Sequence, residues 1–287
     1  MSSKLSRNKI PYKHWEYLNS DTGDSLRIVP ERGGLITSWI CQGREMLYFD
    51  QSRFEDTSKS IRGGVPVLFP ICGDLPENKL HLNDKEYSIN QHGFARDNTW
   101  EISSLNDNCG VNLRLNEDQL SLLSYPFYFT VEIEIRLKIN SLELISTVTN
   151  KGGNTMPFSL GFHPYFLVKD LEKVKIDGLP DKCFDHLTMT EASTSNQLKN
   201  LNKGIDFISK TNHLLSLYDQ VDDITLELTS DKNFHYNVVW TDPPRKMICL
   251  EPWTSPRNAM ISRKNLILLR PQETKTMQCK FALYRTP

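Results

Sequence analysis

The stretch FTVEIEIRLKINSLELISTVT, residues 129–149, decides the fold of this chain. From Phe129 to Ile139 every second residue is apolar, and the residues between them are polar and mostly charged. After Asn140 the alternation resumes on the shifted positions Leu142, Leu144 and Val148. Because successive side chains of a strand point to opposite faces of a sheet, this pattern predicts a long antiparallel hairpin that turns near Asn140. One face of the hairpin is expected to be buried and the other to face water.

Short apolar runs separated by turn residues lie on both sides of the hairpin. They predict strands at residues 25–29, 35–41, 45–49, 224–228, 235–240, 247–251, 266–269 and 276–284. Residues 191–212 are rich in Ser, Asn and Lys, which predicts a loop. No internal repeat, heptad run or low-complexity linker divides the chain. We therefore expect residues 1–287 to form a single all-β domain.

Composition limits the class of partner. The 287 residues are 38% hydrophobic, which is enough for a large core. The formal net charge is −1, with 34 Lys and Arg against 35 Asp and Glu. This balance argues against nucleic acid or a membrane surface as the main partner, because neither is attracted to a nearly neutral chain. A small molecule is the expected partner, and a monomer or weak homo-oligomer is the expected assembly.

The apolar runs of the chain bear on where the protein is located. No apolar run approaches the about 18 residues that span a bilayer, and the first thirty residues lack the apolar core of a secretion signal. A cytoplasmic location is expected.

The six cysteines contain no Cys-x-x-Cys pair and most lie in apolar contexts, which predicts reduced, buried thiols rather than disulfides or a zinc site.

Two neighbouring segments predict a rigid pocket wall. The first reads RGGVPVLFP from Arg62 to Pro70, and the second reads QHGFARDNTW from Gln91 to Trp100. The two glycines after Arg62 are expected to let the backbone approach a ligand, and the prolines to fix an extended path. With His92 and Arg96 in the second segment, the expected ligand is polar and either uncharged or anionic.

Two further residues have unusual settings. His163 lies between Phe162 and Pro164 on a short extended segment with little freedom, so we expect its imidazole to be held in a functional position. Glu251 ends the apolar strand ICLE, residues 248–251. An ionised carboxylate there is costly without a partner, which predicts that Glu251 lies at a pocket mouth or beside a cation.

The motifs Arg62-Gly63-Gly64, Phe69-Pro70 and His92-Gly93-Phe94-Ala95-Arg96 resemble those of the galactose mutarotase superfamily, which contains aldose 1-epimerases and hexose-6-phosphate 1-epimerases. The settings of His163 and Glu251 are similar as well, so the resemblance extends over nearly the whole chain. It implies a large twisted antiparallel β-sandwich, the galactose mutarotase-like supersandwich.

The resemblance also implies roles for individual residues. Glu251 would be the catalytic base and His163 the acid that acts on the ring oxygen. Substrate-binding residues would be Arg62, His92, Arg96 and an aspartate, for which Asp185 is the first choice and Asp181 the second. Arg96 would orient its loop or bind a phosphate. Trp253, Phe94 or Phe162 would offer the sugar an apolar face.

The implied reaction interconverts the α and β anomers of a hexose by opening the ring. Glu251, with a reference pKa of about 4.3, is expected to be ionised, and His163, at about 6.5, to be partly protonated, the more so beside a carboxylate. No cofactor is implied. A metal site is disfavoured because the sequence has no His-x-His or His-x-x-x-His pair.

Three functions stay open at this point. The first is an aldose 1-epimerase, the second a hexose-6-phosphate 1-epimerase, and the third a non-catalytic carbohydrate-binding sandwich. The presence of both His163 and Glu251 favours an enzyme. The remaining histidines are expected to have no catalytic role: His14, His81, His186, His213 and His235.

Overall fold

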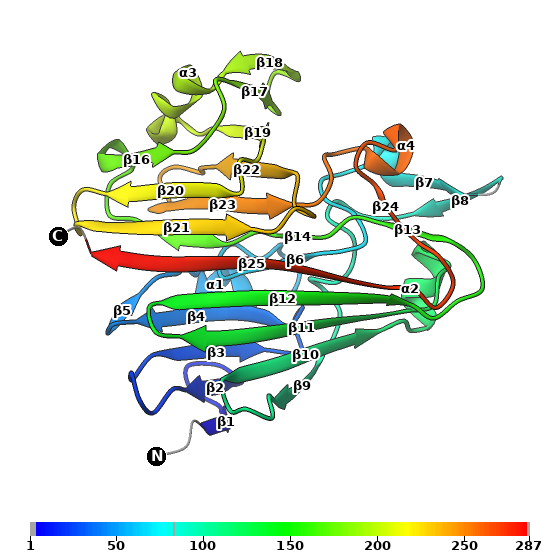
Figure 1. Ribbon diagram of the computed structural model, residues 1–287, viewed down its shortest axis with the longest axis horizontal. Coiled ribbons are helices and arrows are strands. Elements are labelled where there is room, and N and C mark those ends of the chain that lie inside the picture. Colours follow the sequence, from blue (N-terminus) through cyan, green and yellow to red (C-terminus); the bar gives the residue numbers. More distant parts are fainter. Residues whose placement is uncertain (1–3, 83, 286–287) are drawn as a thin grey trace.

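Antiparallel strands in two large sheets make up most of the structure, a computed structural model that describes residues 4–82 and 84–285 (Figure 1). We call the first of these the central sheet. Its strand order is β16 (Val174–Asp177), β20 (Leu214–Asp219), β21 (Ile224–Ser230), β25 (Thr274–Arg285), β12 (Ser141–Asn150), β11 (Phe129–Lys138), β10 (Gly110–Asn116) and β9 (Glu101–Ser104).

The second large sheet carries the candidate site and is called the site sheet. Its strand order is β18 (Thr190–Ser193), β17 (Lys182–Asp185), β19 (Asp206–Lys210), β22 (Tyr236–Trp240), β23 (Met247–Trp253), β14 (Gly161–Phe162) and β6 (Val67–Leu68), and β15 (Tyr165–Leu167) also pairs with β23. A five-stranded sheet has the order β1 (Lys4–Asn8), β2 (His14–Leu18), β3 (Ser25–Val29), β4 (Leu35–Cys41) and β5 (Arg44–Glu45).

Smaller elements complete the fold. Two-stranded sheets join β7 (Lys79–Leu82) to β8 (Lys85–Ser88) and β13 (Met156–Phe158) to β24 (Ile267–Leu269). The helices are short: α1 (Gln51–Glu55), α2 (Gln119–Ser124), α3 (Thr194–Leu198) and α4 (Ala259–Ser262), with 3-10 turns at Pro76–Asn78, Leu171–Lys173 and Leu201–Lys203. Within the described residues, none of these helices has the length and apolarity needed to cross a membrane.

The predicted hairpin is confirmed. Strands β11 and β12 pair antiparallel with Leu137 opposite Leu142, and Asn140 at the turn has a φ of 57°. Asparagine tolerates this left-handed conformation better than most residues, which explains the position of the turn. Ile139 continues the apolar alternation but is 75% exposed, because it lies in the turn beyond the last paired residues.

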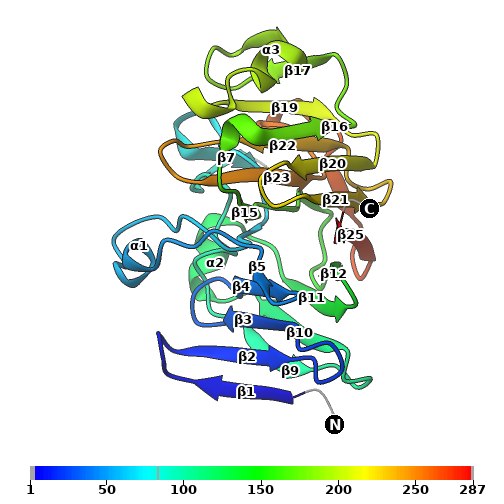
Figure 2. The ribbon, with the colours of Figure 1, turned by 90° about the vertical axis from the view of Figure 1, so that its left-hand side faces the viewer.

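One core joins the sheets. Buried side chains of the five-stranded, central and site sheets form a single hydrophobic cluster that includes Trp39, Ile133 and Phe207. In Figures 1 and 2 the central sheet extends along the height of the molecule, with the five-stranded sheet beside its β9–β11 end and the site sheet beside its β20–β21 end. This arrangement is the predicted all-β architecture. Strand β11 of the central sheet buries one face, whereas β23 of the site sheet is buried on both.

Two predictions of local structure are wrong. Residues 45–49 do not form a strand; β5 ends at Glu45, and Leu47 and Phe49 make only isolated bridges. Residues 191–212 are not a loop, because they contain most of β18, all of α3 and the whole of β19. Consecutive residues of β19, including Phe207 and Ser209, are buried, so the strand shows no alternation that a sequence pattern could reveal.

The cysteines agree with the predicted reduced state. All six are free thiols, and each is buried except the exposed Cys109.

Candidate active site

A pocket of about 210 Å³ opens on the site sheet. Val238 on β22 lies opposite Glu251 on β23, and Asp206 on β19 lies opposite Trp240 on β22. Since directly opposite residues and residues two apart on a strand share a face, these four side chains project from the same face of the sheet. All four line the pocket, together with Trp253 at the end of β23.

Segments outside the strands supply the other walls. Five of the six predicted site residues line this one pocket: Arg62, His92, Arg96, His163 and Glu251. Their roles stay predictions, but the structure brings them together from four distant parts of the chain.

His163 and Glu251 are in direct contact. Nε2 of His163 lies 3.3 Å from Oε1 of Glu251, and the indole N–H of Trp253 donates to Oε2 of Glu251 at 3.1 Å. The His163 ring stacks on Tyr165 with centroids 4.7 Å apart, while its Nδ1 has no hydrogen-bond partner among the described residues. Ring packing therefore orients this imidazole and leaves Nε2 to interact with the carboxyl group.

Burial changes the ionisation of both groups. Burial, with the guanidinium groups of Arg96 and Arg62, lowers the pKa of His163 to about 3. Burial and the charge of Asp206 raise the pKa of Glu251 well above its usual value, although the Trp253 hydrogen bond opposes the shift. The expectation that His163 gains a raised pKa and Glu251 stays readily ionised is therefore wrong, because desolvation and the two arginines outweigh the attraction within the pair.

The backbone decides which nitrogen of His92 faces the pocket. The N–H of Gly73 donates to Nδ1 of His92 at 3.1 Å, so Nδ1 is the acceptor and Nε2 carries the hydrogen. Burial and the neighbouring His163 lower the pKa of His92 well below its usual range, which keeps the ring neutral. A neutral ring with Nε2–H is a hydrogen-bond donor for an oxygen atom of a ligand.

The glycines of the two motifs serve backbone packing. A Cβ on Gly93 would lie 2.1 Å from the carbonyl oxygen of Phe69, which in turn accepts from Phe94 and Ala95. A Cβ on Gly63 would lie 2.5 Å from the Cα of Phe49. The glycine after Arg62 therefore allows close approach to a neighbouring segment of the chain, not to a ligand as we expected.

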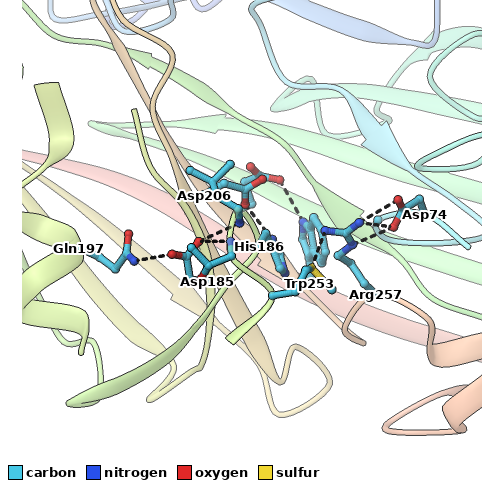
Figure 3. Close-up of polar contacts among 12 residues, drawn as sticks. Asp74, Asp185, His186, Gln197, Asp206, Trp253 and Arg257 are labelled. Carbon is cyan, nitrogen blue, oxygen red and sulfur yellow. Dashed lines mark hydrogen bonds and ion pairs between the residues drawn. The ribbon is translucent and has the colours of Figure 1, made fainter. Parts of the chain in front are cut away.

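The three arginines of the pocket differ in how completely they are paired. Arg257 makes two hydrogen bonds with Asp74, at 2.7 and 2.8 Å (Figure 3). Arg62 packs over the Trp240 ring, and its nearest carboxylate oxygen, on Asp242, is 3.9 Å away. Arg96 donates to the carbonyl oxygen of Gln91, and its nearest carboxylate oxygen, on Asp97, is 3.8 Å away. Arg62 and Arg96 thus keep positive charge that no close carboxylate neutralises.

The structure does not bring Asp185 into the pocket. Its carboxylate accepts from the N–H of Leu187 at 2.8 Å and from the side chain of Gln197 at 3.0 Å (Figure 3). Burial alone would raise the pKa of Asp185, but these hydrogen bonds outweigh burial and lower it. Asp181 is exposed and does not line the pocket either. The carboxylate of Asp185 is therefore paired with neighbouring residues, and neither aspartate lies where it could bind a ligand of this pocket.

The residue after Asp185 lines the pocket instead. Nδ1 of His186 lies 2.7 Å from Oδ1 of Asp206, and the His186 ring stacks on Trp253 (Figure 3). His186 thus lines the pocket as a histidine paired with a carboxylate, and the expectation that it has no catalytic role stays a prediction. Asp206 lies in the segment that we expected to be a loop. Only the short apolar run after Asp206 could have indicated a strand there. Of the expected aromatic residues, Trp253 lines the pocket and Phe94 and Phe162 do not.

One group of side chains could hold a metal ion. Among the described residues, donor atoms of His163, Cys249 and Glu251 lie within 4.8 Å of one another. Burial raises the pKa of Cys249 well above its usual value, which keeps it a thiol and a poor ligand. Cys249 also does not line the pocket, and Arg62 and Arg96 oppose an entering cation. The donor set therefore fits an acid–base pair better than a metal centre.

The chain is similar to several known proteins. The family model described as "Aldose 1-epimerase" matches residues 20–282. Several relatives bear the name "Putative glucose-6-phosphate 1-epimerase". One, from Cenchrus ciliaris, is 31% identical over 51% of this chain and 45% of that protein, so the match spans less than half of it. Another, from Salmonella typhimurium, is 26% identical over 74% of this chain and 69% of that protein.

Solved structures show the same fold. The Slr1438 protein from Synechocystis superposes with a TM-score of 0.91 at 32% identity, over 95% of this chain and 96% of that one. A galactose mutarotase-like protein from Clostridium acetobutylicum gives a TM-score of 0.82 over 99% of both chains, at 18% identity that shows the fold alone. The family match covers most of the sequence, and the chain belongs to the aldose 1-epimerase family.

Proposed function

We propose that this protein interconverts the α and β anomers of a hexose by acid–base opening of the ring. The observation that carries the proposal is the contact of His163 with Glu251, 3.3 Å apart in a buried pocket. Anomer exchange needs one group that takes the proton of the C1 hydroxyl and one that gives a proton to the ring oxygen. A touching imidazole and carboxyl group can do both.

The proton balance fits such a pair. In opening, the C1 hydroxyl gives its proton to Glu251, the bond between C1 and the ring oxygen breaks, and the ring oxygen takes a proton from His163. The aldehyde rotates about the C1–C2 bond, and closure reverses both transfers. The pair holds one proton throughout. The pKa shifts favour this proton on Glu251, and direct contact lets it return to His163 before opening.

Neighbouring residues would hold the sugar in place. Nε2–H of His92 would donate to an oxygen atom, and the carboxylate of Asp206 would accept from a hydroxyl group. The indole rings of Trp240 and Trp253 offer apolar area to the sugar ring. These contacts would fix the reacting atoms against the pair, which is the main purpose of a preformed pocket.

We further propose that the hexose carries a phosphate group. Arg62 and Arg96 line the same pocket, and neither has a carboxylate oxygen closer than 3.8 Å. Guanidinium groups bind phosphate through pairs of charge-assisted hydrogen bonds. The names of the relatives from Cenchrus ciliaris and Salmonella typhimurium support the same substrate class.

An exchange measurement tests both proposals. NMR magnetisation transfer between the two anomers would be compared for glucose, galactose and glucose 6-phosphate, with and without the protein. We expect kcat/KM for glucose 6-phosphate to exceed that for glucose by more than about tenfold, roughly 1.4 kcal/mol. Equal acceleration of all three sugars would favour an epimerase of free aldoses. Binding without acceleration would favour a non-catalytic carbohydrate-binding protein.

A further inference from the structure

The site sheet sets the order of residues across the pocket. Strands β17, β19, β22 and β23 lie side by side in this order, and β14 and β15 pair with the other edge of β23. Glu251 belongs to β23, and His163 lies between β14 and β15. Asp206 begins β19, two strands from Glu251 on the side away from His163. A ligand that crosses the pocket therefore meets His163, then Glu251, then Asp206.

The two arginines of the proposed phosphate site have their backbone on the far side of His163. Arg62 lies just before the backbone that hydrogen-bonds to β15, and Arg96 just after the backbone that bridges to the residue following β6. Burial and these two guanidinium groups lower the pKa of His163. Burial and the charge of Asp206 raise the pKa of Glu251. Positive charge thus acts on one member of the pair and negative charge on the other.

His186 holds the side chain of Asp206 in place. The two residues lie opposite each other, one step beyond the pair of Asp185 and Phe207, and the N–H of His186 donates to the carbonyl oxygen of Asp206 at 2.8 Å. Nδ1 of His186 lies 2.7 Å from Oδ1 of Asp206 (Figure 3). Because an ionised carboxylate only accepts, Nδ1 carries the hydrogen. The His186 ring also stacks on Trp253, and its side chain is only 4% exposed, so this donor has a fixed position.

One oxygen of Asp206 is left for a ligand. Among the described residues, Oδ2 of Asp206 makes no hydrogen bond or ion pair. The side chain is 30% exposed and lines the pocket. Val238, which lies opposite Glu251 on the strand between them, is apolar and offers no donor. A hydroxyl group of the ligand is therefore the natural partner of this oxygen.

We propose that His186 is a positioning residue that makes the site selective at C2 of the sugar, because it fixes the free oxygen of Asp206 on the C2 hydroxyl group. This inference rests on the proposed function, in which the ring oxygen meets His163 and C1 meets Glu251. The ring oxygen, C1 and C2 are consecutive atoms of a pyranose ring, so a sugar placed in this way extends C2 toward Asp206. C5 and the phosphate on C6 extend from the ring oxygen in the other direction, toward the two arginines.

A fixed acceptor discriminates strongly against a sugar that lacks the hydroxyl group. Without it, the carboxylate of Asp206 gives up water and gains no partner. A hydrogen bond to a charged group changes kcat/KM by about 10- to 100-fold. A mobile carboxylate would also lose rotamer freedom when the sugar binds, and the contact with His186 removes that loss in advance.

Deoxy sugars test the contact at C2. The probes are glucose, 2-deoxyglucose and 3-deoxyglucose, each also as its 6-phosphate, and anomer exchange is measured by NMR. Each kcat/KM is divided by the uncatalysed rate constant of the same sugar, because removal of a hydroxyl group changes the intrinsic rate of ring opening. We expect the wild type to lose at least about tenfold on the 2-deoxy sugar relative to its parent, and less on the 3-deoxy sugar.

Variants of His186 tie the preference to this residue. His186→Phe keeps a ring that can stack on Trp253 but has no N–H for Asp206, whereas His186→Asn keeps a side-chain N–H in the place of Nδ1. We expect His186→Phe to lower kcat/KM for the parent sugar at least about tenfold and that for the 2-deoxy sugar less than about twofold. His186→Asn should retain the preference. His81→Phe changes an exposed histidine of β7 outside the pocket and is the matched control, which should alter neither value.

Three results would overturn the role of His186. The first is a wild type that loses as much on the 3-deoxy sugar as on the 2-deoxy sugar, or nothing on either, a comparison that needs no variant to fold. The second is an equal loss for the parent and the 2-deoxy sugar in His186→Phe, which would mean that His186 only supports the pocket. The third is an asparagine variant that behaves like the phenylalanine variant, because the effect would then belong to the ring and not to its N–H.

The outcomes also separate this role from the proposed function. Acceleration of any of the sugars without a preference at C2 leaves the epimerase proposal intact and overturns only the role of His186. Acceleration of no sugar overturns the epimerase proposal. NMR titration then decides the role of His186, which is refuted unless the parent sugar binds more tightly than the 2-deoxy sugar and His186→Phe removes the difference.

Discussion

Nε2 of His163 lies 3.3 Å from Oε1 of Glu251, and burial favours the uncharged form of both groups. The pKa of the imidazole is lowered and that of the carboxyl group is raised, so the pair retains a single proton over a wide range of pH. An ordinary histidine would instead gain a second proton near pH 6.5. This relationship distinguishes the site from a simple acid and base that titrate independently.

The first prediction concerns pH. Because the pKa of His163 is lowered to about 3, the pair gains its second proton only in strong acid, and kcat/KM should not fall between pH 7 and pH 5. The loss of the single proton limits activity on the alkaline side, above the usual range of a carboxyl group. The measurement is anomer exchange of free glucose, since a phosphorylated sugar titrates near pH 6 itself. A decline centred near pH 6.5 would contradict the assigned protonation.

The second prediction concerns stability. The pKa of Glu251 in the folded state is raised above its value of 4.5 in the unfolded chain, so its contribution to stability is present below pH 4.5 and is lost as pH rises. Glu251→Gln carries no such penalty. Its melting temperature relative to wild type should therefore increase from pH 5 to pH 8 by at least about 2 °C, roughly 1 kcal/mol for a chain of this size. A constant difference would show that Glu251 is not destabilised by burial.

The third prediction concerns the arginines. Arg62→Gln and Arg96→Gln should each lower kcat/KM for glucose 6-phosphate by at least about tenfold, because a hydrogen bond between charged groups contributes about 1.5–3 kcal/mol. The value for glucose should change less. Arg114→Gln is the control, since Arg114 is an exposed arginine of the central sheet outside the pocket. Equal losses for both sugars would mean that the arginines shape the pocket and do not bind phosphate.

The fourth prediction separates two aspartates. Asp206 lines the pocket, so Asp206→Asn should raise KM or lower kcat while the fold is retained. Asp185 accepts from Leu187 and Gln197, so Asp185→Asn should lower the free energy of unfolding by about 1–3 kcal/mol and leave KM unchanged. Denaturant titration and exchange kinetics of both variants provide the measurement. A reversed pattern would restore Asp185 as the substrate-binding residue.

The alternation of apolar residues and the sequence motifs predicted the main hairpin and most of the residues that line the pocket. The alternation from Phe129 to Val148 identified the β11–β12 hairpin, because one face of that hairpin is buried and the other faces solvent, so apolar and polar residues alternate along it. The motifs around Arg62, His92, His163 and Glu251 identified four segments that meet in one pocket. These residues can be recognised in the sequence because glycines, prolines and aromatic residues next to them form short motifs that differ from ordinary strand and loop sequence.

The rest depended on contacts that no local pattern contains. Asp206 begins a strand that is buried on both faces, and its place in the pocket follows from its register with Trp240. His186 has unremarkable neighbours in sequence and gains its position from Asp206 and Trp253. The ionisation of Glu251 depends on how deeply it is buried, a property of the assembled fold rather than of its own strand.

The central claim is that the His163–Glu251 pair opens the sugar ring. The most direct test is the rate of anomer exchange by NMR, with the better of glucose and glucose 6-phosphate, for wild type and Glu251→Gln. We expect a rate about 10² to 10⁴ lower in the variant, with sugar binding still detectable by titration. An unchanged rate in a variant that binds the sugar would contradict this claim.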